Sequence, residues 1–281
     1  MATYNWSTVL PFSIGSALRQ TFTDFELLVV GDGCTDDSEQ VVAGIGDPRV
    51  RWINLPENTR HQSGPNNEGL RQARSEIIAY LAHDDLWLPN HLSLLVTAFD
   101  ETQCDLAYTL AASVGPDNSY IWPIIPNERL GSFSATSAMA HHRRVTDRIG
   151  GWRHYREIPA FPDAELWQRA QSAGCRFTFV PRLSTIKFSA AARRDVYKLR
   201  PCHEQAEWLK RIETEPDLEP QLLVRFVTNA HLASGLPYRD LVRHFVRQTW
   251  SRISRRWRVL WLRRTLRPLR TVDDARRYKG L

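Results

Sequence analysis

The sequence has few of the residues that mark a disulfide-stabilised or zinc-bearing protein. It contains four cysteines in 281 residues, and none of them belongs to a C-x-x-C pair. This wide spacing argues against a structural zinc site and gives little basis for a disulfide framework. A reducing, cytoplasmic environment is therefore expected. The cysteines are Cys34, Cys104, Cys175 and Cys202.

Long apolar runs are also absent. No stretch approaches the roughly 18 uninterrupted apolar residues that a membrane span needs. The first residues, Met1 to Trp6, have neither the basic start nor the apolar run of a signal peptide. We therefore expect a cytoplasmic protein, with at most a peripheral contact at the inner face of the membrane.

The charge of the chain is uneven. Lys and Arg number 37 against 31 Asp and Glu, and the excess lies from Tyr238 onward. Between Leu241 and Leu266 apolar residues mix with arginines and three tryptophans, which suits either a helix on an anionic membrane surface or a helix that packs its apolar stripe on the catalytic domain. Nucleic-acid binding is not expected, because no recognised motif accompanies the charge. The tryptophans are Trp250, Trp257 and Trp261.

Hydrophobic periodicity predicts strands that alternate with helices in the first part of the chain. Such alternation is typical of an α/β fold with a mostly parallel, doubly wound sheet. The middle of the chain, 105–139, is expected to form short strands and loops, and the chain beyond about 195 is expected to be helical. Strands are predicted at 25–30, 50–55, 76–81 and 177–180, where Pro181 ends the last one, and helices at 14–21, 36–42, 67–74, 89–99 and 163–173.

Two acidic clusters follow directly after predicted strands. Asp32 follows the first strand and the pair Asp84–Asp85 follows the third, at the edge of an α/β sheet where ligands collect. Adjacent carboxylates repel unless a cation or hydrogen-bond donors compensate. Mg²⁺ and Mn²⁺ bind through one or two carboxylates together with substrate phosphates. The pair therefore predicts either a metal–diphosphate site or a cap for the helix that begins near Pro89.

Two further carboxylates, Asp163 and Glu165, lie at a predicted helix start. A carboxylate there can act as a general base toward a hydroxyl, or can simply complement the positive end of the helix dipole. His141 and His142 lack a third ligand at a suitable spacing, so a loop or surface position is expected for them. A metal hydrolase built on His83 and Asp84 is disfavoured for the same reason.

The order of these motifs resembles the family-2 inverting glycosyltransferases of the GT-A fold, over roughly residues 2 to 188. Each piece is short, but the ordered set is specific. The matching segments are Ala2–Asn5, Ser16–Phe22, Phe25–Asp37, Asn67–Leu70, Ala79–Pro89, Gly150–Trp152 and Asp163–Trp167.

The resemblance implies a nucleotide-sugar donor, commonly UDP-linked, bound with Mn²⁺ or Mg²⁺. By position in the motifs, Thr3 and Tyr4 would contact the base and Asp32 the uracil edge. Asn67 would also belong to the donor site. Asp84 would hold ribose and diphosphate through a metal that Asp84 and Asp85 ligate. The catalytic base would be Asp163, with Glu165 as its close neighbour.

The sequence departs from the family pattern at four places. Ala82 stands where an acid is usual, Gly31 replaces the first of two acids, and Asn66 replaces a frequent arginine. The apolar strand that usually precedes the Thr-Tyr-Asn segment is missing, because Met1 stands almost in its place. We hypothesise that the natural chain starts further upstream.

These observations predict a GT-A domain over residues 1–190 and a helical, basic region over 191–281. The expected activity is transfer of one sugar to a glycan, lipid-linked or small-molecule acceptor, since the Gln-x-x-Arg-Trp motif of processive synthases is absent. A degenerate member that binds nucleotide or glycan without turnover is the alternative. A nucleotidyltransferase would need a Gly-rich phosphate loop bearing Lys or Arg, and none is visible.

Overall fold

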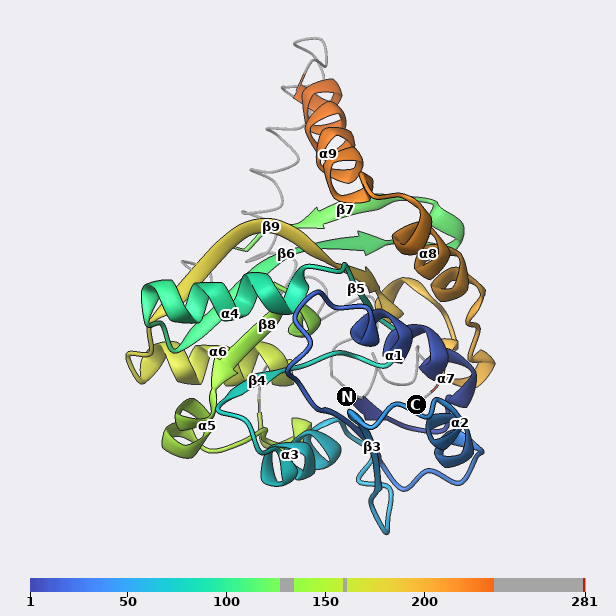
Figure 1. The fold of residues 1–281 in the computed structure, drawn as a ribbon, viewed down its shortest axis with the longest axis vertical. Helices are drawn as coiled ribbons and strands as arrows, with labels where there is room; N and C mark the ends of the chain where they lie inside the picture. Colours follow the sequence, from blue (N-terminus) through green and yellow to red (C-terminus); the bar gives the residue numbers. More distant parts are fainter. Residues whose placement is uncertain (127–133, 159–160, 235–279, 281) are drawn as a thin grey trace, which may run out of the picture.

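The computed structural model of the chain describes residues 1–126, 134–158, 161–234 and 280. A three-stranded parallel sheet with the order β1-β2-β3 holds the N-terminal part (Figure 1). Its middle strand is buried along its whole length, which explains the unbroken apolar run in the sequence. The strands are β1 (Ala2–Thr3), β2 (Leu27–Gly31) and β3 (Val50–Asn54), and the helices of this part are α1 (Leu10–Leu18), α2 (Ser38–Gly44) and α3 (Ser63–Gln72).

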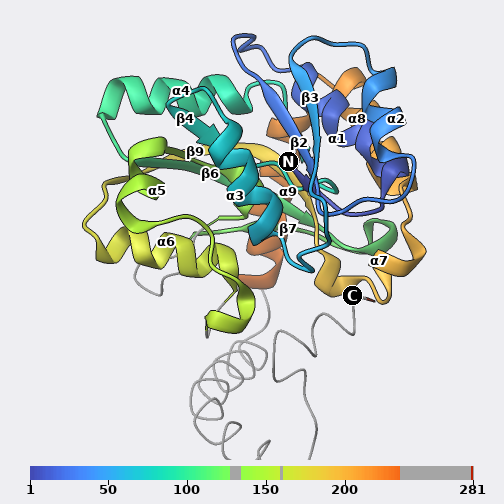
Figure 2. The ribbon, with the colours of Figure 1, turned by 90° about the horizontal axis from the view of Figure 1, so that it is seen from below.

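A larger sheet of six strands follows, with the order β4-β8-β6-β9-β5 and β7 beside β6. Helix α4 covers one face of this sheet, and α5 and α6 lie on the other (Figure 2). The strands are β4 (Ile77–Ala79), β5 (Leu86–Trp87), β6 (Leu106–Val114), β7 (Ile121–Ile124), β8 (Met139–His142) and β9 (Phe177–Phe188), and the helices are α4 (His91–Thr102), α5 (Arg143–Ile149) and α6 (Pro162–Ser172).

The α/β architecture predicted from the sequence is confirmed, and the second sheet adds detail to it. Within that sheet β6 and β9 run parallel, whereas the other pairings are antiparallel. The segment 105–139, predicted as short strands and loops, contains the nine-residue strand β6. Burial of β6 by β8 and β9 on its two sides outweighs the weak period of its sequence.

Pro181 does not end the last strand, contrary to the prediction. Strand β9 continues through Pro181 to Phe188, and its pairing with β6 shifts register between Tyr108 and Leu110. A proline has no N–H to give to a ladder, and an irregularity of this kind accommodates it. As a result, the part of β9 beyond Pro181 carries Lys187 to the candidate site described below.

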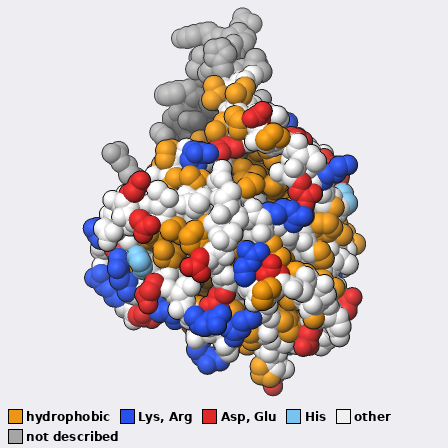
Figure 3. Space-filling model, viewed as in Figure 1, with side chains coloured by type: hydrophobic (Ala, Val, Ile, Leu, Met, Phe, Trp, Pro, Cys, Tyr) orange, Lys and Arg blue, Asp and Glu red, His pale blue; other side chains and the backbone are white. Residues whose placement is uncertain are grey.

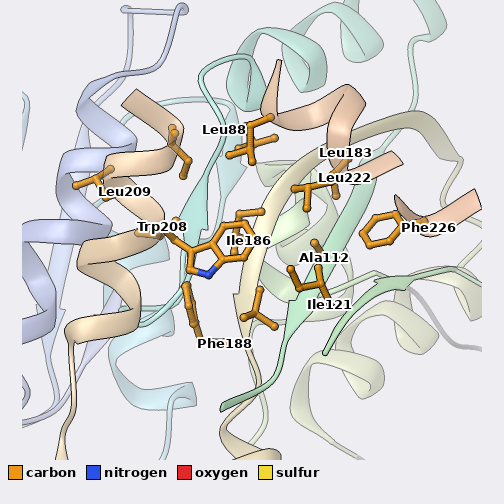
Figure 4. Close-up of a cluster of buried hydrophobic side chains, with 14 residues drawn as sticks. Leu88, Ala112, Ile121, Leu183, Ile186, Phe188, Trp208, Leu209, Leu222 and Phe226 are labelled. Atoms are coloured by element: carbon orange, nitrogen blue, oxygen red, sulfur yellow. The ribbon is translucent and has the colours of Figure 1, made fainter. Parts of the chain in front are cut away.

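The chain beyond β9 packs back on the body through helices. A hydrophobic cluster joins side chains of β5, β6 and β9 to those of α8 and α9 (Figure 4). Trp208 is its largest fully buried member. The elements are α7 (Val196–Leu199), α8 (His203–Thr214) and α9 (Leu218–Ser234), with short 3₁₀ turns η1 (Ser7–Val9), η2 (Pro116–Asn118), η4 (Thr136–Ala138), η5 (Tyr155–Glu157) and η6 (Ala190–Ala192) elsewhere.

The basic, tryptophan-bearing segment Leu241–Leu266 lies outside the described residues. Within the described ranges, none of the helices combines the length and the apolarity that a bilayer crossing needs. On the face seen in Figure 3, positive and negative side chains are interspersed. Glu26, for example, pairs with both Arg51 and Arg74.

In place of a full first strand, the chain has the two residues of β1. The Met1 amine donates to the carbonyl of Leu28 at 2.8 Å, and burial lowers its pKa to about 5. Beyond Met1, a cavity of about 310 Å³ is lined by residues of both β2 and β4, including Leu28 and Ile78. The two sheets are therefore not joined by a hydrogen-bond ladder across this gap.

Three buried histidines make the stability of the fold sensitive to acid. Burial lowers the pKa of His83 to about 4, of His91 to about 3 and of His141 to about 4, against an ordinary value of 6.5. The prediction that His141 lies in a loop or at the surface is therefore wrong: it lies in β8 and contacts the Tyr80 hydroxyl at 2.9 Å. His91 contacts the Ser184 hydroxyl through Nδ1, while its Nε2 has no hydrogen-bond partner among the described residues.

We expect the free energy of unfolding to fall as the pH drops from 6.5 toward 4. The unfolded chain binds more protons than the folded one in this window, at a cost of up to about 3 kcal/mol for each buried imidazole. Thermal unfolding from pH 8 to pH 5 checks this, with His91→Gln expected to show a shallower slope. A melting temperature that stays constant between pH 7 and pH 5 would contradict the expectation.

Candidate active site

The candidate site lies where β2, β4 and β9 end. It gathers side chains from β1, from the loops after β2 and β4, from η4, from the start of α6 and from the end of β9. Asp32, the pair Asp84–Asp85 and Asp163 come from three distant parts of the sequence. Asp32 and the pair follow strands β2 and β4, whose ends the α/β topology brings to one edge, and Asp163 lies at the start of α6.

Asp32 is buried just after β2, and its backbone is tied to the first strand. Its N–H donates to the carbonyl of Thr3 at 2.8 Å. Its side-chain Oδ1 accepts from the backbone N–H and the hydroxyl of Thr59, at 2.9 and 2.6 Å. Both of these bonds use the same oxygen, so Oδ2 is the oxygen that could contact a ligand. Tyr4 follows Thr3 directly and is half-buried.

His83 links the first strand to the acidic loop. Its Nδ1 lies 3.0 Å from the hydroxyl of Thr3, and its ring stacks edge-on against Trp6 at 5.1 Å. Burial keeps this imidazole neutral at neutral pH, with a pKa of about 4. Thr3 and His83 are thus neutral polar side chains that lie beside the carboxylates.

The adjacent acids Asp84 and Asp85 have different environments. Asp85 is fully buried, and its oxygens accept from Ser137 Oγ at 2.6 Å, Phe188 N at 3.0 Å and Lys187 Nζ at 3.3 Å. These three donors favour the ionised carboxylate, although burial raises its pKa. Asp84 instead is anchored through its backbone, since its carbonyl accepts from Gln205. Asp85, which is not exposed at all, therefore has a structural set of partners inside the protein, whereas Asp84 is 7% exposed.

A single 3₁₀ turn holds two of the carboxylates. In η4, the Thr136 hydroxyl donates to Asp163 Oδ2 at 3.0 Å, and the neighbouring Ser137 holds Asp85. Ser137 also accepts from the N–H of Ala82 at 3.0 Å, and its carbonyl accepts from the Trp87 indole. Because Thr136 and Ser137 are consecutive residues, the single turn η4 fixes the distance between Asp163 and Asp85.

Asp163 occupies the first turn of α6 and is half-buried. Besides Thr136, its Oδ1 accepts from the backbone N–H of Ala164 at 2.9 Å. Each carboxylate oxygen has a second lone pair, so the group can still accept a proton. Asp163 lies in the candidate site because Thr136, which donates to it, is next to Ser137, which donates to Asp85.

Glu165 is committed to ion pairs. Arg169 grips both of its oxygens, at 2.9 and 3.0 Å, and Arg153 lies 3.3 Å away. Arg169 in turn donates to the carbonyls of Gly150 and Gly151. These contacts assign to Glu165 the positioning of the Gly150–Gly151 loop.

Asn67 holds the same loop from the opposite side. Its amide donates to the carbonyl of Trp152 at 2.9 Å and accepts from the N–H of Trp152 at 2.8 Å. A Cβ atom on Gly151 would lie 2.3 Å from Asn67 Oδ1, so only glycine fits this close approach. Both ends of the Asn67 side chain are thus used within the protein.

Sequence reasoning missed the cation of the site. Lys187, near the end of β9, pairs with Asp85 although 102 positions separate them. Burial alone would lower its pKa, but the nearby charges of Asp85, Asp84 and Asp163 raise it. Thr59, Thr136, Ser137 and Arg169 were missed for a similar reason, since their contacts are made only in the folded chain.

The donor set fits a divalent metal only when substrate phosphates complete it. Among the described residues, no group of three or more His, Cys, Asp or Glu side chains could hold a metal by itself. Asp84 and Asp85 would supply the carboxylates, and three donors already lie on the oxygens of Asp85. Mg²⁺ is commonly held by one or two carboxylates and the phosphates of a substrate.

Sequence comparison gives the family. The profile of the family described as "Glycosyl transferase family 2" matches residues 1–159. A UDP-Glc:alpha-D-GlcNAc-diphosphoundecaprenol beta-1,3-glucosyltransferase of Escherichia coli, WfgD, is 30% identical over 38% of this chain and 42% of its own length. The succinoglycan biosynthesis protein ExoO of Rhizobium meliloti is 36% identical over 38% of this chain and 30% of its own length. The chain spans about half or less of the length of these curated relatives.

Solved structures give the fold. Residues 1–349 of Staphylococcus aureus TarS, in complex with UDP-GlcNAc, superimpose with a TM-score of 0.57 at 16% identity, over 85% of this chain and 76% of that fragment. The mannosyltransferase PcManGT of Pyrobaculum calidifontis, in complex with GDP-Man and Mn²⁺, gives 0.54 at 15% identity, over 91% and 81%. The profile covers more than half of the chain, and the neighbours share its architecture. The chain therefore belongs to glycosyltransferase family 2 and has the GT-A fold.

Proposed function

We propose that the protein transfers a sugar from a UDP-linked donor to an acceptor hydroxyl with inversion of configuration. The observation that carries this proposal is the shared tether of Asp85 and Asp163 on the consecutive residues Ser137 and Thr136. These two hydrogen bonds hold Asp85 at a fixed distance from Asp163, which is the candidate base. The diphosphate would lie beside the Asp84–Asp85 loop.

In the proposed reaction, Asp163 takes the proton of the acceptor hydroxyl. The acceptor oxygen then bonds to the anomeric carbon from the face opposite the leaving group, and the bond from that carbon to the nucleoside diphosphate breaks. Glu165 is paired with Arg169 and Arg153, so its role is to position the loop beside Asp163. A base within hydrogen-bond reach of the acceptor contributes typically 10²- to 10⁴-fold to the rate.

The donor would lie across both sheets. Thr3, Tyr4 and the free oxygen of Asp32 would contact the base, and Asp84 would lie beside the ribose and diphosphate. Asp84 would hold Mn²⁺ or Mg²⁺ together with the phosphates, and such an ion neutralises charge on the leaving diphosphate when it is bound. Asn67 would act on the donor indirectly, through the Gly151–Trp152 backbone that it clamps.

The acceptor is proposed to be a glycan or a lipid-linked sugar. WfgD is named for an acceptor on diphosphoundecaprenol, which is a lipid carrier. An acceptor of this kind would place the protein in the cytoplasm at the inner face of the membrane, in a pathway of polysaccharide synthesis. The alternative is a binding protein without turnover. Ala82 favours it, because the acidic loop there lacks one carboxylate.

Calorimetric titration of UDP, with and without Mn²⁺, tests the donor site. Binding that strengthens with Mn²⁺ is expected, and Asp32→Ala is expected to weaken it at least tenfold, because a buried hydrogen bond to the base edge is lost. The matched control is Asp47→Ala, since Asp47 pairs with Arg49 away from the site. No UDP binding by the folded protein would refute the donor assignment, and binding without any sugar transfer would favour the alternative.

A further inference from the structure

The acidic site contains a fixed ammonium group. Lys187 lies in β9, one residue before its end at Phe188, and its Nζ is 3.3 Å from Asp85 Oδ2. The side chain of Lys187 is 31% exposed, whereas that of Asp85 is fully buried. The pair therefore has a buried anchor and a cation that reaches the solvent side of the site.

Lys187 has more hydrogen-bond donors than its pairing with Asp85 uses. Ser137 and the Phe188 N–H already donate to the two oxygens of Asp85. An ammonium has three N–H donors, and within the described residues Lys187 donates to Asp85. Donors of Lys187 therefore remain for a ligand at the site.

Other cations near the site are already engaged. Arg193 pairs with Glu204 and donates to the carbonyls of Val114 and Ser189. Arg169 donates to both oxygens of Glu165 and to the carbonyls of Gly150 and Gly151. Among these described side chains, Lys187 is the cation whose donors are left over beside Asp84.

We propose that Lys187 binds the diphosphate of the donor and carries part of the positive charge that stabilises it as a leaving group. The inference rests on the proposed function and deepens it. An ammonium preorganised by a buried carboxylate needs no rearrangement when charge develops on the leaving oxygen. Part of the affinity for diphosphate is then independent of a divalent metal, and it adds to what Asp84 and a metal supply.

The test compares UDP with uridine as calorimetric probes, each in EDTA and in Mn²⁺. In EDTA the wild-type protein is expected to bind UDP more tightly than uridine. Lys187→Met is expected to weaken UDP binding at least tenfold and leave uridine binding unchanged, whereas Lys187→Arg should retain most of the preference. Lys210→Met is the matched control, because Lys210 is exposed on α8.

Removal of Lys187 leaves Asp85 buried with one donor fewer, so the fold needs its own control. The double variant Asp85→Asn, Lys187→Met removes both charges together and should melt near the wild-type temperature. The proposal is overturned if either folded variant binds UDP in EDTA as tightly as the wild type. Failure of the wild type to bind both uridine and UDP would instead refute the proposed function, so the two failures are distinguishable.

Discussion

Asp163→Asn is expected to abolish sugar transfer while leaving donor binding unchanged. Asparagine keeps the shape of the side chain. Its amide oxygen can accept from the Ala164 N–H, and its NH2 group can donate to the Thr136 hydroxyl oxygen in place of the bond that this hydroxyl donates to Asp163, so the first turn of α6 should stay in place. It cannot take the proton of the acceptor hydroxyl. A loss of about 10²- to 10⁴-fold in kcat follows, with the affinity for UDP equal to that of the wild type.

The neighbouring carboxylate supplies the comparison. Glu165→Gln weakens the ion pairs with Arg169 and Arg153, so it should lower the melting temperature and loosen the Gly150–Gly151 loop. Its effect on kcat should be much smaller than that of Asp163→Asn. A full rate of transfer in Asp163→Asn would show that the base is another group.

Asp84→Ala and Asp85→Ala are expected to lose metal-linked nucleotide binding for two different reasons. Asp84→Ala removes the carboxylate that would hold the ion and should cost less stability than Asp85→Ala. Asp85→Ala removes an acceptor that three donors share, and it leaves Lys187 without its partner. We expect this second change to cost about 2 kcal/mol of stability, which is less than for a fully buried pair because Lys187 is partly exposed.

Thermal unfolding and UDP titration with Mn²⁺, done on both variants, separate the two roles. The expected result is a larger drop in melting temperature for Asp85→Ala than for Asp84→Ala, together with lost dependence on Mn²⁺ in both. Equal stability of the two variants would show that Asp85 is not the structural anchor of the site. Asp100→Ala serves as the control, because Asp100 is exposed on α4.

The sequence predicted the residues whose roles depend on their own strand or helix. Asp32 and Asp84 follow short apolar runs that predict strands, and such runs can be recognised in the sequence alone. Asp163 begins a helix, as predicted. The α/β class followed from the same alternation of strands and helices, and the comparisons confirm the family.

The sequence could not predict which polar side chains pair with one another in the folded protein. Glu165 and Asp163 look alike two positions apart, but only the fold brings Arg169 and Arg153 to the first and Thr136 to the second. Lys187 was hidden for the same reason. Proline was taken as the end of its strand, whereas a shift in the pairing of β6 and β9 absorbs Pro181.

The gap beside β1 leaves the described strands in two ladders rather than one. Strands β1 to β3 form the first and the six other described strands the second, and a cavity of about 310 Å³ lies between β2 and β4. Buried side chains still pack across this seam, since Leu27 and Val29 of β2 share a hydrophobic cluster with Leu81 and Trp87. A nucleotide bound as proposed, against Asp32 beside the first ladder and Asp84 beside the second, would add a further link across the seam. We therefore expect amide hydrogen exchange in β2 and β3 to slow when the donor site is occupied.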